Sequence, residues 1–147
     1  MTGPASSRLL ELRFAARPAE LRKVRGSVRE AALRGGLGDT CAADVVMAVD
    51  EACQNVIRHA YAGNPDGAIE LRIDREADAL VISLIDYAPE VDPAVVRGRD
   101  LDELRPGGLG THLIRRAMDE VGFEAPPPGC GNLLRMVKRL RPRGEEP

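Results

Sequence analysis

A carboxylate and a carboxamide stand four residues apart in the stretch DVVMAVDEACQNVIRHAY, residues 44–61. The spacing of the apolar residues in this stretch predicts an amphipathic helix. Its apolar stripe is formed by Val46, Val49, Cys53, Val56 and Ala60. Glu51 and Asn55 would share a separate face, where they could hold a hard cation such as Mg²⁺ or orient a hydroxyl group. The spacing alone also fits an ordinary solvated helix face.

A second carboxylate follows a strongly apolar segment. Residues 80–85, LVISLI, are typical of a buried central strand, and Asp86 comes directly after them. A carboxylate at the end of such a strand can face a pocket, although Asp is also a common turn residue. Ala88 follows two residues later, and an alanine there disfavours any backbone conformation with positive φ.

A glycine-rich stretch, GGLGTHL at residues 107–113, precedes a predicted helix at residues 109–121. Backbone N–H groups at the start of a helix can bind phosphate oxygens, and the helix dipole favours this. The apolar stripe of that helix is expected to include Leu113, Ile114, Ala117 and Val121. The polar, proline-containing residues 90–106 that precede the glycines have the length and composition of a lid.

Taken in order, these features resemble the GHKL family of ATP-binding domains. Glu51-x-x-x-Asn55 followed by His59-Ala60-Tyr61 is similar to its N box, Asp86 to its aspartate turn, and Gly108-x-Gly110 to its second glycine box. MDEV at residues 118–121 is also similar to a segment of the small bacterial anti-sigma-factor serine kinases (RsbW- and SpoIIAB-like). The resemblance covers about residues 9–140.

The resemblance implies a role for each candidate site residue. Glu51 would be the catalytic residue that accepts or orients the proton of the attacking serine, and Asn55 would bind Mg²⁺ between the ATP phosphates. Asp86 would accept a hydrogen bond from the adenine amino group. The other implied ATP-binding residues are Ala88, Arg105, Gly108, Leu109, Gly110 and Thr111. His59 is expected to be structural, as a packed or hydrogen-bonded side chain.

The activity implied by the resemblance is that of a serine/threonine-protein kinase and anti-sigma factor in a partner-switching system. Such a protein binds ATP and Mg²⁺, sequesters a sigma factor, and phosphorylates a serine on a STAS-type anti-sigma factor antagonist; a homodimer is also implied. The alternative is a catalytically silent ATP-binding switch that acts by contact with a phosphatase or another partner. A fragment of a sensor histidine kinase is disfavoured, because both histidines, His59 and His112, lie within the ATP-domain motifs.

Hydrophobic periodicity predicts the helices and strands that carry these residues. Strands are expected at residues 8–15, 68–74, 80–85 and 132–140, and a further helix at residues 19–34. Asp39 or Thr40 is expected to cap the helix that carries Glu51. The order predicts an α+β fold, a two-layer α/β sandwich in which helices cover one face of a mixed, mostly antiparallel sheet. We expect one domain over residues 1–147, with an ATP lid at about residues 87–107.

The composition excludes several other classes of function. Aromatic residues make up 3% of the chain and the net charge is −2, which argues against nucleic-acid binding. No apolar run approaches the roughly 20 residues needed to cross a bilayer, and we expect a cytoplasmic protein without a membrane partner. The three cysteines show no metal-ligand spacing with the histidines.

Overall fold

Five strands form one sheet in the computed structural model, which describes residues 6–88 and 109–140. The strands are β1 (Ser6–Ala15), β2 (Ala68–Glu76), β3 (Ala79–Asp86), β4 (Glu120–Glu124) and β5 (Asn132–Arg139). They lie in the order β1-β2-β3-β5-β4. Every pairing among the described strands is antiparallel, so this part of the sheet is more regular than the mixed sheet that the sequence predicted.

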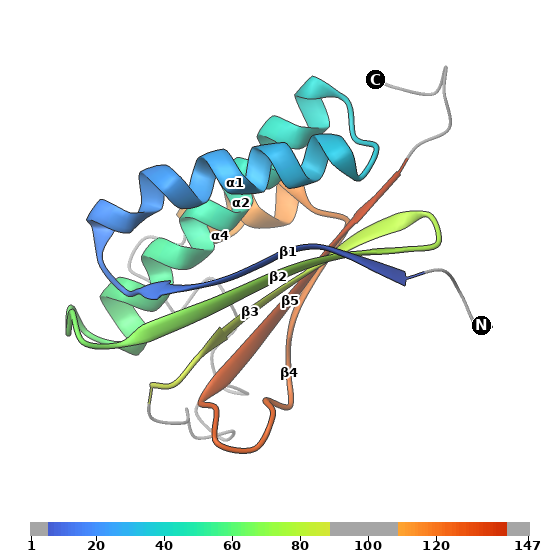
Figure 1. Cartoon of the computed structure of the whole chain (residues 1–147). Helices are drawn as coiled ribbons and strands as arrows, with labels where there is room; N and C mark the ends of the chain where they lie inside the picture. Colours follow the sequence, from blue (N-terminus) through green and yellow to red (C-terminus); the bar gives the residue numbers. More distant parts are fainter. Residues whose placement is uncertain (1–5, 89–108, 141–147) are drawn as a thin grey trace.

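The helices cover one face of the sheet (Figure 1). They are η1 (Pro18–Glu20), α1 (Leu21–Arg34), α2 (Asp39–Asn55), η2 (Val56–Ala60) and α4 (Leu109–Ala117). α2 packs against α1 on one side and α4 on the other. This arrangement is the predicted two-layer α+β sandwich, and its core lies between the helices and the sheet. In the described residues, no helix is long and apolar enough to cross a membrane.

The helix α1 and the hairpin β2–β3 follow the sequence pattern closely. The buried residues of α1 are Leu21, Val24, Val28, Ala31 and Ala32, as the helical spacing predicts. Alternate residues of β2 (Ile69, Leu71 and Ile73) are fully buried. The two strands are joined through Ala77, whose φ is 51°, and Asp78, so a tight turn forms without glycine.

Two details of α2 and of the turn η2 that follows it differ from the prediction. Its N-cap is Gly38, so neither Asp39 nor Thr40 caps it. Val46, Val56 and Ala60 are only partly buried. The buried residues of α2 are Cys41, Ala42, Val45, Ala48, Val49, Ala52 and Cys53. The buried face is wide and rich in alanine because α2 packs between two helices as well as on the sheet, and small side chains allow that close approach.

The prediction that one helix runs from residue 109 to residue 121 is wrong at its C-terminal end. α4 ends at Ala117, and Val121 lies on strand β4, where it pairs with Met136. The backbone N–H of Asp119 already donates to the carbonyl of Val137, at 2.8 Å. Val121 fits the helical spacing by coincidence, and pairing with β5 decides its conformation.

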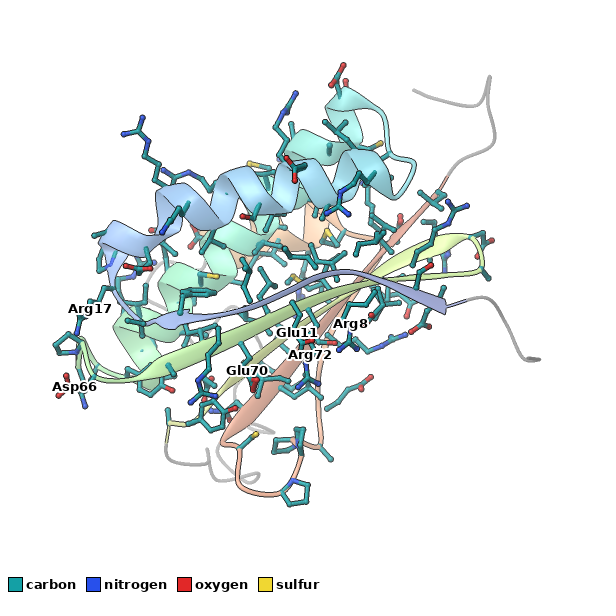
Figure 2. All side chains as sticks on the ribbon, in the orientation of Figure 1. Arg8, Glu11, Arg17, Asp66, Glu70 and Arg72 are labelled. Atoms are coloured by element: carbon teal, nitrogen blue, oxygen red, sulfur yellow. The ribbon has the colours of Figure 1, made fainter. Side chains whose placement is uncertain are left out.

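Ionic side chains cover the other face of the sheet across β1 and β2 (Figure 2). Arg8 pairs with Asp74 at 2.7 Å and with Glu11 at 3.5 Å. Arg72 lies 3.5 Å from Glu11 and 3.8 Å from Glu70. Across β1 and β2 this face therefore carries alternating charges, whereas the apolar side chains of β2 point to the helices.

Candidate functional site

Glu51 and Asn55 lie in the last turn of α2, on the shared face that the sequence predicted. Both residues are partly buried, and the Glu51 side chain is 16% exposed. Arg58, from η2, contacts both of them. Its Nη2 lies 3.6 Å from Glu51 Oε2 and donates a hydrogen bond to Asn55 Oδ1 at 3.3 Å. The predicted base and the predicted metal ligand thus share one cationic neighbour.

The segment after Asn55 does not continue as an α-helix. Residues Val56–Ala60 form a π-helical turn, and the N–H of Tyr61 donates to the carbonyl of Val56 at 3.0 Å. Such wide turns are rare and are often found at functional sites. Within this turn His59 is exposed, so it is not packed in the core, and its expected structural role stays a prediction.

Asp86 ends β3 as predicted, and its side chain is buried. The residue is 4% exposed and lies on the helix-covered face, in alternation with Leu84 and Ile82. Its Oδ1 accepts hydrogen bonds from the amide of Asn132 and the backbone N–H of Ala88, both at 3.0 Å. Burial raises the pKa of the Asp86 carboxyl above its ordinary value of 3.8, and these two hydrogen bonds partly oppose the rise.

Ala88 fits the aspartate turn without strain. Among the described residues other than glycine, positive φ values occur at Ala62 and Ala77, and Ala88 is not one of them. The close approach is made instead by Gly131, whose N–H donates to the carbonyl of Asp86 at 2.7 Å. A Cβ at Gly131 would lie 1.9 Å from the carbonyl oxygen of Ala88. This turn therefore needs its glycine at position 131 rather than at position 88.

The helix that carries Glu51 and the strand that ends at Asp86 are joined by Tyr61. Its hydroxyl accepts a hydrogen bond from the N–H of Tyr87 at 2.8 Å. The start of β2 lies at the same end of the sheet, because Ile69 pairs with Asp86. This contact brings the predicted N box and the predicted aspartate turn together at one end of the molecule.

The glycine box is described in part. Leu109, Gly110 and Thr111 form the first turn of α4, whereas Arg105 and Gly108 lie outside the described residues. The predicted lid, apart from Tyr87 and Ala88, also lies outside them.

The direction of α4 is set at its C-terminal end. Lys138 Nζ donates to the carbonyl of Ala117 at 2.7 Å. Lys138 lies at one end of β5, and Asn132, which pairs with Asp86, lies at the other end. The N-terminal end of α4 is therefore directed toward the end of the sheet that carries Asp86 (Figure 1). A helix start in that direction suits a phosphate group.

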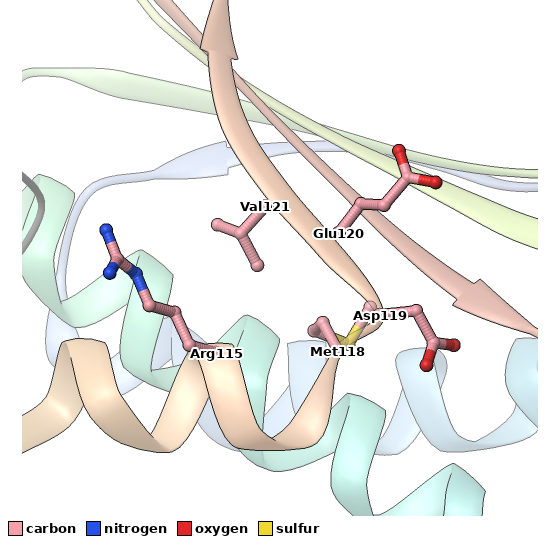
Figure 3. A pocket seen from close by; sticks show the side chains of 5 residues that line it. All are labelled: Arg115, Met118, Asp119, Glu120 and Val121. Atoms are coloured by element: carbon pink, nitrogen blue, oxygen red, sulfur yellow. The ribbon is translucent and has the colours of Figure 1, made fainter.

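A surface pocket lies elsewhere, where α4 leads into β4 (Figure 3). It is lined by Arg115, Met118, Asp119, Glu120 and Val121. None of these is a predicted site residue, and the pocket is broadly open to solvent. The pocket therefore does not include the predicted site residues Glu51, Asn55 and Asp86.

Several residues at this site were not assigned a role from the sequence. Arg58 lies within the N box but was given no role there, and Tyr61 was noted only as part of that motif. Gly131 and Asn132 are 45 and 46 residues beyond Asp86, and local patterns cannot relate residues that far apart. For Gly131 and Asn132, the sequence offered one signal, a glycine and an asparagine at the start of a predicted strand.

The chain is similar to proteins of known family over most of its length. The histidine kinase-like ATPase domain family matches residues 14–138. "Serine-protein kinase RsbW" of Bacillus pumilus is 31% identical, covering 90% of this chain and 86% of that protein. The protein of the same name from Bacillus subtilis is 28% identical, covering 76% of this chain and 75% of that protein.

Solved structures show the same fold. The RsbU and RsbW domains of a Mycobacterium tuberculosis protein give a TM-score of 0.61 at 20% identity, over 95% of this chain and 32% of that one. The mycobacterial sensor histidine kinase MprB gives a TM-score of 0.56 at 14% identity, over 90% of this chain and 99% of that one. By sequence and by fold, the chain belongs to the histidine kinase-like ATPase domain family, in the branch of the RsbW serine-protein kinases.

Proposed function

We propose that this chain is a protein serine kinase and anti-sigma factor that phosphorylates a STAS-type antagonist with ATP. The observation that supports the proposal is the hydrogen bond from the Tyr87 N–H to the Tyr61 hydroxyl, since it joins the end of the predicted N box to the turn that follows Asp86. The names of the relatives supply the class of reaction. Phosphoryl transfer depends chiefly on positioning and charge neutralisation, which such a small set of residues can provide.

Each residue has one task in the proposed reaction. Asp86 accepts a hydrogen bond from the adenine amino group, and the first turn of α4, which includes Gly110, donates N–H groups to phosphate. Glu51 takes the proton of the substrate serine as its oxygen attacks the γ-phosphorus. The bond from that phosphorus to the β,γ-bridging oxygen breaks, and ADP leaves. The remaining predicted ATP ligands are Ala88, Arg105, Gly108, Leu109 and Thr111.

Magnesium fits the donor groups at this face. The described residues contain no cluster of three or more His, Cys, Asp or Glu side chains that could hold a metal alone. Mg²⁺ commonly keeps several waters and binds one or two protein oxygens together with nucleotide phosphates. Asn55 Oδ1 is the oxygen that would hold it here, and the bound ion would neutralise phosphate charge.

The partners follow from the same proposal. The chain would hold a sigma factor inactive and release it when the unphosphorylated antagonist binds instead. We also propose a homodimer, a cytoplasmic location and a single domain over residues 1–147. Ala88 in the aspartate turn gives little support to the catalytically silent alternative, because its φ is not positive.

The test is transfer of labelled γ-phosphate from ATP and Mg²⁺ to candidate STAS-type proteins of the same organism. We expect label on a serine of one antagonist with the wild-type chain. Glu51→Ala should abolish the transfer but leave the complex with the antagonist intact. Asn55→Ala should lower both the transfer and the Mg²⁺-dependent binding of ATP.

Two outcomes would overturn parts of the proposal. Transfer that persists in Glu51→Ala would remove Glu51 as the base. ATP binding and a stable complex without any transfer would support the silent switch instead. As a matched control we suggest Glu30→Ala, on the exposed side of α1, which should transfer phosphate at the wild-type rate.

A further inference from the structure

The hydroxyl of Tyr61 makes three hydrogen bonds at the end of the β2–β3 ladder. It donates to the carbonyl of Ala68 and accepts from the N–H of Ala68 at 3.2 Å and from the N–H of Tyr87 at 2.8 Å. The last backbone pair of that ladder is Ile69 with Asp86. The hydroxyl therefore binds the next residue of each strand and fixes the point at which the two strands separate.

The ring of Tyr61 reaches this point because of two local features. The π-helical turn Val56–Ala60 carries the chain from α2 to Tyr61. Gly67 lies against the ring, and a Cβ at Gly67 would lie 2.5 Å from the ring carbons. Because no side chain fits between them, the ring lies directly on the backbone just before β2.

The segment from Asp86 to Ala88 is held from two sides. On one side the N–H of Tyr87 donates to Tyr61, and on the other the N–H of Gly131 donates to the carbonyl of Asp86. The carboxylate of Asp86 is bonded in turn by Asn132 and by the N–H of Ala88. Loss of the Tyr61 hydroxyl would free the peptide that directly follows Asp86 and would leave its partly buried N–H without this partner.

We propose that Tyr61 is a positioning residue, which sets the place of the Asp86 carboxylate relative to α2 and so sharpens recognition of the adenine amino group. The inference rests on the proposed function, since it assigns Asp86 to adenine. A series of contacts from Asn55 through η2, Tyr61 and Tyr87 to Asp86 then links the phosphate end of the proposed site to its adenine end. Tyr61 touches no nucleotide in this proposal; it acts through Asp86.

The test compares ATP with inosine triphosphate, in which a carbonyl replaces the amino group of the base. We measure the Kd of each nucleotide by calorimetry for the wild type and for Tyr61→Phe, which keeps the ring. Tyr61→Phe should weaken ATP binding about three- to tenfold, the range expected for loss of the one hydrogen bond between Asp86 and the adenine amino group. It should change the binding of inosine triphosphate much less, so the preference for ATP falls.

Tyr87→Phe is the matched control, because the Tyr87 hydroxyl bonds Glu70 and Arg13 away from Asp86. It should keep the wild-type preference for ATP. In an Asp86→Asn background, Tyr61→Phe should not change the preference further, because the residue through which it acts is already altered.

The outcomes separate the inference from the proposed function. If Tyr61→Phe lowers the melting temperature but keeps the ATP preference, Tyr61 is only structural and the inference is wrong. If Tyr61→Phe reduces the preference for ATP equally in the wild type and in the Asp86→Asn background, Tyr61 does not act through that carboxylate. This result would also overturn the inference. If the wild type binds neither nucleotide, the proposed function fails and the positioning role fails with it.

Discussion

The guanidinium of Arg58 lies 3.6 Å from the carboxylate of Glu51, two helical turns further along the chain. The same Nη2 donates to Asn55 Oδ1 at 3.3 Å. Arg58 is about half exposed, at 47%, and can move away from the helix, whereas Glu51 is largely covered. The oxygen proposed to bind Mg²⁺ is therefore already engaged by a cation, which the metal must displace.

Replacement of Arg58 by alanine should lower the Mg²⁺ concentration needed for half-maximal ATP binding. The change removes a competing donor and a like charge, and an exposed pair of this kind is worth about a two- to fivefold effect. Titration with Mg²⁺ at fixed ATP measures it. Arg29→Ala is the control, because Arg29 pairs with exposed Asp39, which begins α2 at the opposite end from Asn55. A higher Mg²⁺ requirement in Arg58→Ala would show that Arg58 binds phosphate instead.

Asp86 should make the stability of the protein depend on pH. Burial raises the pKa of its carboxyl above 3.8, so the folded protein keeps this proton at pH values where the unfolded chain has lost it. The associated stabilisation is present below the ordinary pKa and is lost as the pH rises through the folded pKa. Asp86→Asn cannot titrate. Urea unfolding should therefore give a wild-type stability that falls relative to the variant from about pH 4 upward. A wild-type stability that stays constant or rises relative to Asp86→Asn as the pH increases would contradict the raised pKa.

Gly131 should not tolerate a side chain. A Cβ there would lie 1.9 Å from the carbonyl oxygen of Ala88, which is backbone and cannot rotate away. Gly131→Ala should lower the free energy of unfolding by about 1–3 kcal/mol, the usual range for overpacking, and should weaken ATP binding by displacing Asp86. Gly122→Ala is the control, because a Cβ at Gly122 meets nothing within 4 Å. Equal stability of the two variants in urea would show that the turn can shift freely.

The sequence predicted those parts of the fold that depend on local hydrophobic spacing. The buried face of α1 and the strand that ends at Asp86 were both correct, because short-range periodicity reports burial directly. Val121 was assigned to a helix because its spacing fits, and only its pairing with Met136 shows that it lies on a strand.

The candidate site was predictable only in part, for a similar reason. Glu51 and Asn55 share a face because they are four residues apart, which any helix ensures. The contact of Gly131 with Ala88 and the hydrogen bond from the Tyr87 N–H to the Tyr61 hydroxyl join residues far apart in sequence. The π-helical turn that helps to bring Tyr61 to this place has no signature in the residue pattern.

Lys138 should hold α4 in place through its buried ammonium group. Nζ donates to the carbonyl of Ala117 at 2.7 Å, and a cation at a helix C-terminus is favoured by the dipole. Lys138→Met keeps the stem but leaves that carbonyl without this donor, so the free energy of unfolding should fall by about 1–3 kcal/mol. Arg139→Met, an exposed change on the same strand, should lower it by less than about 1 kcal/mol. Urea unfolding of both variants measures the difference. A Lys138→Met protein as stable as the wild type would mean that dehydration of the buried ammonium offsets the hydrogen bond.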